Sequence, residues 1–263
     1  MDGDPVHSWP ASGARATSGT AITRAGCARV TFLAGIVLLA ATWTGAAPAK
    51  APGNPVVKAT HEVAALLSPH EALSRPAAGS TRLRVIQARR PITGVRTALP
   101  VLGRRTGPSG VRWLRVRLPG RPNARSGWIR RQGTVSFRTK WHIVIRASSR
   151  RVAVYRYSRR VRVFMAVVGK ASTPTPRGRF FVEEVIQMPA GAAGAPFAFA
   201  LSARSNVLQE FAGGPGQIGL HGLRNIGGTL GTAVSHGCVR LDDRALRWLV
   251  TRIGPGVPVT ITR

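Results

Sequence analysis

The chain has few cysteines, few acidic residues and only one long apolar run. Its 263 residues include two cysteines and nine aspartates and glutamates, and no C-x-x-C or H-x-x-x-H pair occurs. No internal repeat, heptad pattern or long low-complexity tract is present. Hydrophobic residues make up 44% of the sequence, which excludes a wholly disordered chain, and the single long apolar run excludes a polytopic membrane protein.

Negative charge is missing over much of the chain. No aspartate or glutamate occurs from Ala72 to Val182, and the formal net charge is +30. Such a charge favours polyanionic partners, which include nucleic acid, anionic lipid head groups and anionic cell-wall polymers. Because 35 of the 39 basic residues are arginine, a general arginine bias of the genome would explain the same composition. Charge alone therefore names no partner.

The N-terminal region has the order of a secretory signal. Residues 30–49 carry no charge and are mostly apolar, three arginines precede them, and Ala47-Pro48-Ala49 resembles a cleavage site. We expect residues 1–49 to be either a signal peptide or an uncleaved membrane anchor that uses residues 30–49. In both cases the rest of the chain is exported, to the cell wall or a periplasm-like space.

Export leaves one thiol outside the cytoplasm. Cys27 precedes the apolar run, so it is either removed or kept on the cytoplasmic side. Cys238 then cannot form an intramolecular disulfide. A free thiol outside the cell is prone to oxidation, so its presence calls for a specific role.

The rest of the chain divides by composition into three parts. Residues 50–80 are rich in alanine and proline and are expected to be a linker, with one short helix at 60–73. Residues 81–136 hold short alternating runs broken by turn residues, which predict a small β-barrel-like module with Trp113 and Trp128 in its core.

Strand patterns continue through residues 140–263. WHIVIRA, VAVYRY and VRVFMAVVG predict three antiparallel strands joined by tight turns, and further strands are expected at 180–186 and at the C-terminal VPVTITR. The segment 242–253 has helical spacing, with Asp242 or Asp243 as its N-cap. The fold class is therefore mainly β, with one short C-terminal helix.

The surroundings of Cys238 allow three interpretations. His236-Gly237 directly precedes it, and His221-Gly222 begins 17 positions earlier, so either imidazole could take the thiol proton and make the sulfur a nucleophile. The two histidines and the cysteine, with Asp242 or Asp243, could instead bind zinc. The third interpretation is a buried structural cysteine. An exported lone cysteine next to two His-Gly pairs favours the nucleophile.

Two ordered motifs resemble the L,D-transpeptidases, the family with a YkuD-type catalytic domain. IGLHG at 218–222 followed by SHGCVRL at 235–241 is similar to the active-site signature of that family. VVGKASTPTPRGRFFV at 167–182 is similar to its T-P-x-G-x-F loop. The resemblance covers about residues 141–263, and the module at 81–136 is loosely similar to bacterial Src-homology-like domains.

The resemblance implies a β-sandwich enzyme that acts on peptidoglycan stem peptides. It implies that Cys238 is the nucleophile and forms a thioester, with release of D-alanine, before the acyl group passes to an amine of another stem. His221 would be the base, oriented by the carbonyl of Gly222. Ser235, His236 and Gly237 would shape the pocket near the oxyanion-binding amides. Arg240 would bind a substrate carboxylate, and neither a metal nor an organic cofactor is expected.

The same residues are compatible with other functions. The same thioester captured by water would make the protein an L,D-carboxypeptidase. An arginine-rich β surface with a vestigial cysteine would make it a non-catalytic protein that binds the cell wall. Nucleic acid is not expected as a partner, because the chain has no motif for it and is exported.

Overall fold

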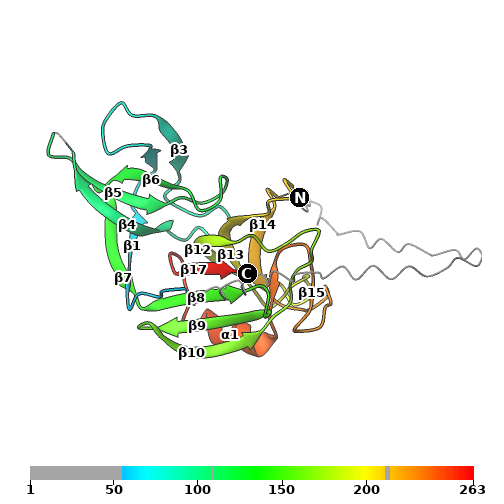
Figure 1. Ribbon diagram of the computed structural model, residues 1–263. Coiled ribbons are helices and arrows are strands. Elements are labelled where there is room, and N and C mark those ends of the chain that lie inside the picture. The colour runs from blue at the N-terminus through cyan, green and yellow to red at the C-terminus, as the bar shows by residue number, and fades with distance from the viewer. Residues whose placement is uncertain (1–54, 108, 211–213) are drawn as a thin grey trace, which may run out of the picture. The chain divides into compact units, whose positions relative to one another are not determined.

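The computed structural model describes residues 55–107, 109–210 and 214–263. The predicted signal peptide or anchor at 1–49 lies outside these residues. Within them the regular structure consists of β-strands and one short helix, and Gly53–Arg263 clusters as one compact unit. The described part contains no helix that is long and apolar enough to span a membrane. The prediction of a mainly β fold with one short C-terminal helix is confirmed (Figure 1).

The first half of the described chain forms a seven-stranded sheet with the order β3-β2-β6-β5-β4-β1-β7. Its strands are β1 (His61–Leu66), β2 (His70–Leu73), β3 (Arg82–Ile86), β4 (Ala98–Thr106), β5 (Arg112–Arg117), β6 (Ser126–Arg130) and β7 (Thr134–Thr139). Leu114 and Val116 of β5 are fully buried in its core, whereas Trp113 is buried on the opposite face and Trp128 is half-buried.

The prediction of a helix at 60–73 is wrong, because this stretch forms β1 and β2. The segment 50–80, which was expected to be a linker, therefore contains two strands. β1 pairs antiparallel with β4 on one side and with β7 on the other. These partners lie more than 30 residues away, so local propensity could not reveal them. The division into a β module at 81–136 and a catalytic domain at 140–263 stays a prediction.

The second half forms an eight-stranded sheet with the order β10-β9-β8-β17-β12-β13-β14-β16. Its strands are β8 (Trp141–Arg146), β9 (Arg151–Arg156), β10 (Arg159–Met165), β12 (Gly178–Gln187), β13 (Phe197–Arg204), β14 (Gln217–His221), β16 (Val239–Arg240) and β17 (Pro258–Thr262). The three predicted antiparallel strands are confirmed as β8, β9 and β10.

A separate two-stranded sheet and one helix complete this half. β11 (Val168–Gly169) pairs in parallel with β15 (Ala233–Ser235). The helix α1 (Asp243–Val250) begins after Asp242, whose carboxylate accepts a hydrogen bond from the Ala245 amide at 2.6 Å. The predicted N-cap is therefore confirmed for Asp242, and the cap satisfies one amide that the first helical turn leaves unpaired.

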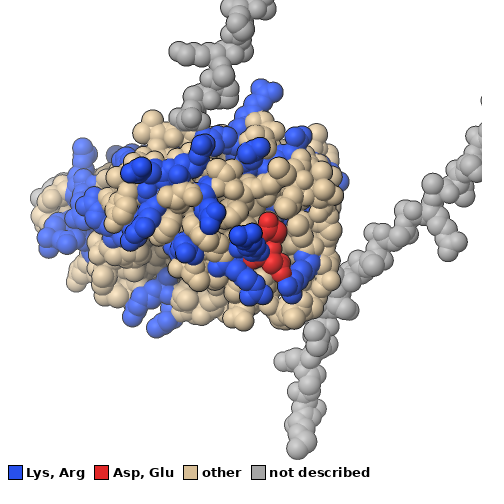
Figure 2. All heavy atoms as spheres, turned by 90° about the horizontal axis from the view of Figure 1, so that it is seen from below, with Lys and Arg blue, Asp and Glu red and all other residues tan. Residues whose placement is uncertain are grey.

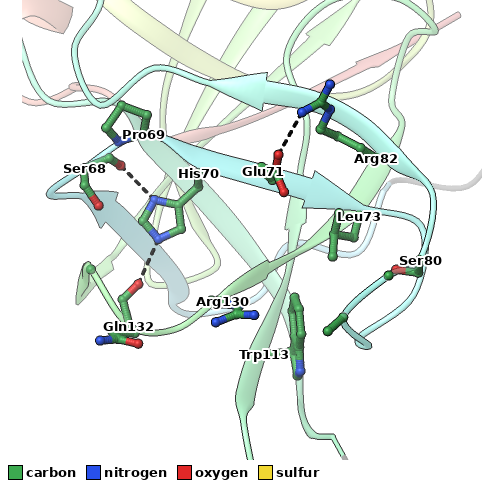
Figure 3. A pocket seen from close by; sticks show the side chains of 13 residues that line it. Ser68, Pro69, His70, Glu71, Leu73, Ser80, Arg82, Trp113, Arg130 and Gln132 are labelled. Atoms are coloured by element: carbon green, nitrogen blue, oxygen red, sulfur yellow. Dashed lines mark hydrogen bonds and ion pairs between the residues drawn. The ribbon is translucent and has the colours of Figure 1, made fainter.

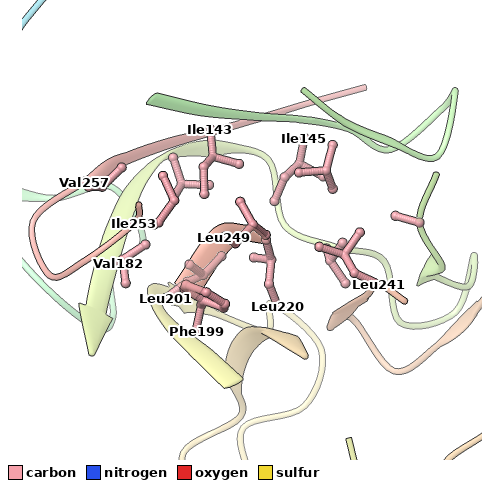
Figure 4. Close-up of a cluster of buried hydrophobic side chains, with 14 of the residues drawn as sticks. Ile143, Ile145, Val182, Phe199, Leu201, Leu220, Leu241, Leu249, Ile253 and Val257 are labelled. Atoms are coloured by element: carbon pink, nitrogen blue, oxygen red, sulfur yellow. The ribbon is translucent and has the colours of Figure 1, made fainter. Parts of the chain in front are cut away.

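The sheet curls around α1 to form the main core. Ile143 and Ile145 face Leu249 of the helix from one side, while Phe199 and Leu201 lie on the other side (Figure 4). All five side chains are buried. Because the strands that end at the candidate site are part of this packed core, their ends are held in fixed positions.

Strand β12 contributes to both cores, because successive side chains of a strand point to opposite faces. Phe180 and Val182 belong to the core around α1, whereas Phe181 packs with the core of the seven-stranded sheet. The two sheets are therefore joined by shared apolar packing. Glu183 of the same strand extends this contact through its ion pair with Arg90.

A buried ion-pair network lies beside that contact. The Glu183 carboxylate accepts from Arg90 and, at 3.2 Å, from Arg204, and the Glu183 side chain is fully buried. Glu184 accepts from the Thr93 hydroxyl at 2.8 Å. Burial raises the pKa of Glu183, although the two guanidinium groups oppose this effect. The network fastens the segment around Arg90 to the second sheet.

Replacing Glu183 with alanine is expected to lower the free energy of unfolding by about 3 to 5 kcal/mol, because two guanidinium groups lose their buried counter-charge. Urea unfolding of the full chain measures this loss. The matched control is Glu71→Ala, whose partner Arg82 is 62% exposed. Breaking this exposed pair should cost less than about 1 kcal/mol. Equal losses for the two variants would contradict the prediction.

Candidate active site

His221 ends strand β14, and its ring orientation is set by the residue that follows. The imidazole Nδ1 lies 2.9 Å from the carbonyl oxygen of Gly222. A carbonyl only accepts, so Nδ1 carries the hydrogen and donates. In the neutral ring, Nε2 is then left with a free lone pair. This is the tautomer that a general base requires.

Two glycines make room for this arrangement. A Cβ at Gly222 would lie 1.8 Å from the carbonyl oxygen of Ala195, and a Cβ at Gly194 would lie 2.6 Å from the His221 Nδ1 atom. The Gly222 amide also donates to the Gly194 carbonyl at 2.7 Å. Sequence reasoning selected Gly222 but missed Gly194, which lies in the small-residue segment that precedes β13. Only the folded chain brings Gly194 against the imidazole.

The register of two parallel strands brings Cys238 near His221. β14 pairs with β16 so that Leu220 lies opposite Val239 and His221 lies opposite Arg240. Cys238 directly precedes β16, and alternate residues of an extended chain share a face. The thiol, the Arg240 side chain and the imidazole therefore share one face. Gly219 occupies the neighbouring position of β14 on that face and leaves space there, since it has no side chain.

The thiol and the imidazole do not hydrogen-bond to each other among the described residues. The Cys238 Sγ atom lies 3.9 Å from the carbonyl oxygen of Gln217, and the side chain is half-buried. Catalytic hydrogen bonds often tighten only when substrate binds, so the lack of a bond between these two groups is compatible with proton transfer in a complex.

Burial keeps both groups neutral. It lowers the pKa of His221 to about 4, and the positive charge of Arg240 adds to this effect against the Gly222 hydrogen bond. Burial also raises the pKa of the Cys238 thiol, although the Gly219 backbone and Arg240 oppose the rise. At neutral pH the pair is therefore a thiol and an uncharged imidazole rather than a thiolate and an imidazolium.

The turn before Cys238 is held by Ser235. The Ser235 hydroxyl donates to the Cys238 carbonyl at 2.6 Å and accepts from the Gly237 amide at 3.2 Å. Ser235 is fully buried, whereas His236 is exposed. Gly237 has a φ of +119°, a conformation that side chains rarely adopt. His221 and Ser235 thus lie beside the cysteine, while the His236 side chain faces solvent.

The loop at 169–175 hydrogen-bonds to the turn at 235–238, here called the cysteine turn. The buried Thr175 hydroxyl donates to the Gly237 carbonyl at 2.9 Å and accepts from the Gly169 amide at 2.9 Å. The Thr173 hydroxyl donates to the Ser235 carbonyl at 3.3 Å. A Cβ at Gly169 would lie 2.4 Å from the Thr173 carbonyl oxygen. Both threonines therefore position the cysteine turn, a role that sequence reasoning missed because it depends on contacts 62 residues apart.

Replacing Thr175 with valine is expected to lower kcat/KM about tenfold and the free energy of unfolding by about 2 kcal/mol, because two buried backbone groups lose their partner. Steady-state kinetics and urea unfolding measure the two effects. Thr175→Ser keeps the hydroxyl and should restore the activity. A valine variant as active as the parent would show that these hydrogen bonds do not position Cys238 for activity.

Arg240 is buried, and one nitrogen of its guanidinium group hydrogen-bonds to backbone carbonyls of the protein. Its Nη1 donates to the carbonyl oxygens of Ile226, at 3.2 Å, and Gly227, at 2.9 Å. Its Nε is buried without a hydrogen-bond partner in the described part of the chain. The guanidinium therefore supports the loop between His221 and Cys238 and retains an unused donor.

A metal centre finds no support in the described residues. No group of three or more histidine, cysteine, aspartate or glutamate side chains is arranged to hold a metal ion there.

A cavity of about 760 Å³ lies on the seven-stranded sheet, between Glu71, Arg82 and Trp113, and its lining does not include Cys238 (Figure 3). This cavity is therefore separate from the thiol.

Positive side chains are spread widely over the surface. The face shown in Figure 2 carries many lysine and arginine side chains and one small acidic group. The excess of positive over negative charge is thus visible on the folded protein, and it would attract polyanions to this face.

Comparison with known proteins matches the second half of the chain to one family. Residues 140–261 match the YkuD model, which describes an L,D-transpeptidase catalytic domain. A Bacillus licheniformis protein named as an L,D-transpeptidase of the YkuD type is 31% identical over 134 residues, which are 51% of this chain and 70% of that protein. The Bacillus subtilis counterpart is 28% identical over 47% of this chain and 66% of its own length.

Solved structures give a more distant match. An L,D-transpeptidase from Mycobacterium smegmatis is 20% identical, with 58% of this chain and 90% of that chain covered and a TM-score of 0.37.

Proposed function

The chain belongs to the L,D-transpeptidase family with a YkuD-type catalytic domain, and we propose that it cross-links peptidoglycan stem peptides through a Cys238 thioester. The observation that carries the proposal is the 2.9 Å contact between the His221 Nδ1 atom and the Gly222 carbonyl. It leaves Nε2 ready to accept a proton on the face that also holds the thiol.

The first half of the reaction forms the thioester. As the Cys238 sulfur attacks the carbonyl carbon of the third stem residue, the thiol proton passes to His221 Nε2. The resulting oxyanion is stabilised by backbone N–H groups of the cysteine turn. The Gly237 amide already donates to Ser235, so we assign the Cys238 amide as the donor. The intermediate collapses when His221 returns the proton to the amine of D-alanine, which leaves.

The second half transfers the acyl group. An amine of a neighbouring stem attacks the thioester carbon and gives up a proton to His221 Nε2, and the released sulfur takes that proton back. A new amide bond forms, the C–S bond breaks and the neutral thiol is restored. No metal or organic cofactor enters any step. We assign Arg240 to a carboxylate of the stem, since it lies on the face that holds the thiol and the imidazole.

The partners and location follow from the same proposal. Residues 1–49 would export the chain as a signal peptide, or residues 30–49 would anchor it in the cytoplasmic membrane. The strong excess of positive charge would hold the exported part near anionic cell-wall polymers. The export proposal rests on the sequence, because residues 1–49 lie outside the described part.

Intact-mass spectrometry of the purified protein with a tetrapeptide stem tests the proposed reaction. We expect an acyl adduct on Cys238, release of D-alanine and appearance of stem dimers. D-alanine and tripeptide without dimers would assign the protein as an L,D-carboxypeptidase instead. Folded, reduced protein that gives neither adduct nor product would contradict the enzymatic function and favour a wall-binding role.

The acid limb of kcat/KM is expected near pH 4, well below the value for an ordinary histidine. Only the neutral imidazole can accept the thiol proton, and the pKa of His221 is lowered to about 4. Activity should therefore be nearly equal at pH 7 and pH 5.5 and fall about tenfold per pH unit below 4. A kcat/KM profile from pH 3 to 8, with circular dichroism as the folding control, measures this. A midpoint near pH 6.5 would contradict the assigned environment of His221.

A further inference from the structure

A second cavity lies where the two sheets meet, away from the cysteine. It has a volume of about 140 Å³ and is lined from the seven-stranded sheet by Leu102 and Arg117, and from the eight-stranded sheet by Arg179 and Phe180. Apolar side chains form part of its wall. The catalytic proposal does not use this cavity.

Three cationic side chains line the cavity, and no carboxylate does. Lys58 and the two arginines, Arg117 and Arg179, come from three separate segments of the chain. None of them forms an ion pair in the described residues, and Glu62, which is close in sequence to Lys58, pairs instead with Arg104. No carboxylate of the described residues therefore neutralises the positive charge of the cavity.

The ionisation of the surrounding groups reflects this excess charge. Burial lowers the pKa of Arg117, and the charges of Arg179 and Arg115 lower it further. Burial also lowers the pKa of His142 to about 3, with His61 and Arg179 adding to the effect. For these two groups every contribution opposes positive charge. An anion in the cavity would relieve this repulsion.

Neutral hydrogen-bonding groups form another side of the cavity. His142 Nδ1 lies 3.1 Å from His61 Nε2, and His142 Nε2 lies 2.8 Å from the Thr260 hydroxyl. His142 is 6% exposed, so its ring is held in place. The cavity thus combines three cations with a fixed row of polar groups, and this row spans both sheets.

We propose that this cavity is a binding site for a phosphate group. Phosphate presents several acceptor oxygens and close to two negative charges, which matches convergent guanidinium and ammonium donors better than a single carboxylate does. Because Arg117 belongs to β5 and Arg179 to β12, a bound phosphate would link the two sheets. The site would stabilise the contact between the sheets and is independent of the thioester chemistry.

Isothermal titration calorimetry of the full chain with inorganic phosphate, at constant ionic strength, tests the site. Arg179→Gln should weaken phosphate binding at least about tenfold, because it removes one charge-assisted donor from the cavity. The matched control is Arg177→Gln, since Arg177 is also exposed on the same segment but does not line the cavity. It should bind phosphate like the parent. Lys58→Gln provides a second variant if Arg179→Gln fails to fold.

Comparison of Arg179→Gln with Arg177→Gln distinguishes phosphate binding in the cavity from general attraction of phosphate to a basic protein. Equal phosphate affinity of Arg179→Gln, Lys58→Gln and the parent would overturn the proposal, and so would acetate binding as tightly as phosphate. Arg179→Gln and Lys58→Gln should still release D-alanine at the parental rate. A glycerol-phosphate oligomer that binds more tightly than inorganic phosphate would support the site with a polymer as the source. Equal affinity per phosphate group would support it with free phosphate as the source.

Discussion

Replacement of Cys238 with serine is expected to lower kcat/KM for D-alanine release at least about a thousandfold and to abolish the covalent adduct. A serine hydroxyl is a far weaker nucleophile beside a neutral imidazole than a thiol is. The change keeps a small polar side chain at this half-buried position, where the Sγ atom makes a long contact of 3.9 Å with the Gln217 carbonyl oxygen. The fold should therefore remain intact, which urea unfolding can verify.

The other cysteine supplies the control for this experiment. Cys27 lies before the apolar run and outside the described residues, and Cys27→Ala should retain full activity and the adduct. Substantial D-alanine release by folded Cys238→Ser would contradict the thioester mechanism. Loss of activity in both Cys238→Ser and Cys27→Ala would indicate that export or handling of the variants, rather than loss of the Cys238 thiol, causes the inactivity.

Replacement of His221 with glutamine is expected to lower kcat/KM about a thousandfold or more, because the amide cannot accept the thiol proton. Steady-state release of D-alanine measures this loss. The residual activity should also lose its acid limb near pH 4, since the titrating imidazole is gone. A residue with a merely structural role would lower activity without changing the pH profile.

His236→Gln is the matched control for that change. His236 lies two residues before the cysteine, but its side chain is exposed. If it shapes the substrate pocket, the control should raise KM and leave kcat and the acid limb unchanged. If the glutamine at 236 abolished turnover while the glutamine at 221 did not, the assignment of the base would have to be reversed.

The two histidines show why spacing alone left the base open. Both are followed by glycine and both are close to Cys238 in sequence or in the fold. The parallel register of β14 with β16 places His221 on the face of Arg240. The tight turn at Gly237, with its φ of +119°, leaves His236 in solvent. A register between distant strands depends on the whole sheet, so no local pattern contains it.

Much of the second half of the fold could be predicted because its signals are local. The alternation in WHIVIRA and VAVYRY and the turn residues between them identify strands β8 to β10, and Asp242 before an amphipathic run identifies α1. The ordered motifs around His221 and Cys238 indicate the family. These features require only the chemistry of neighbouring residues.

Tertiary structure decided the features that depend on distant partners. The segment expected to be a helix at 60–73 became β1 and β2, because β4 and β7 flank β1. Thr175 became a clamp because its hydroxyl meets a carbonyl 62 residues away, and Lys58, Arg117 and Arg179 met in one cavity from three segments. Sequence by itself determined the chemical groups and the local elements of this protein. Their mutual placement came from long-range pairing and packing, whose free energy no short stretch of the chain encodes.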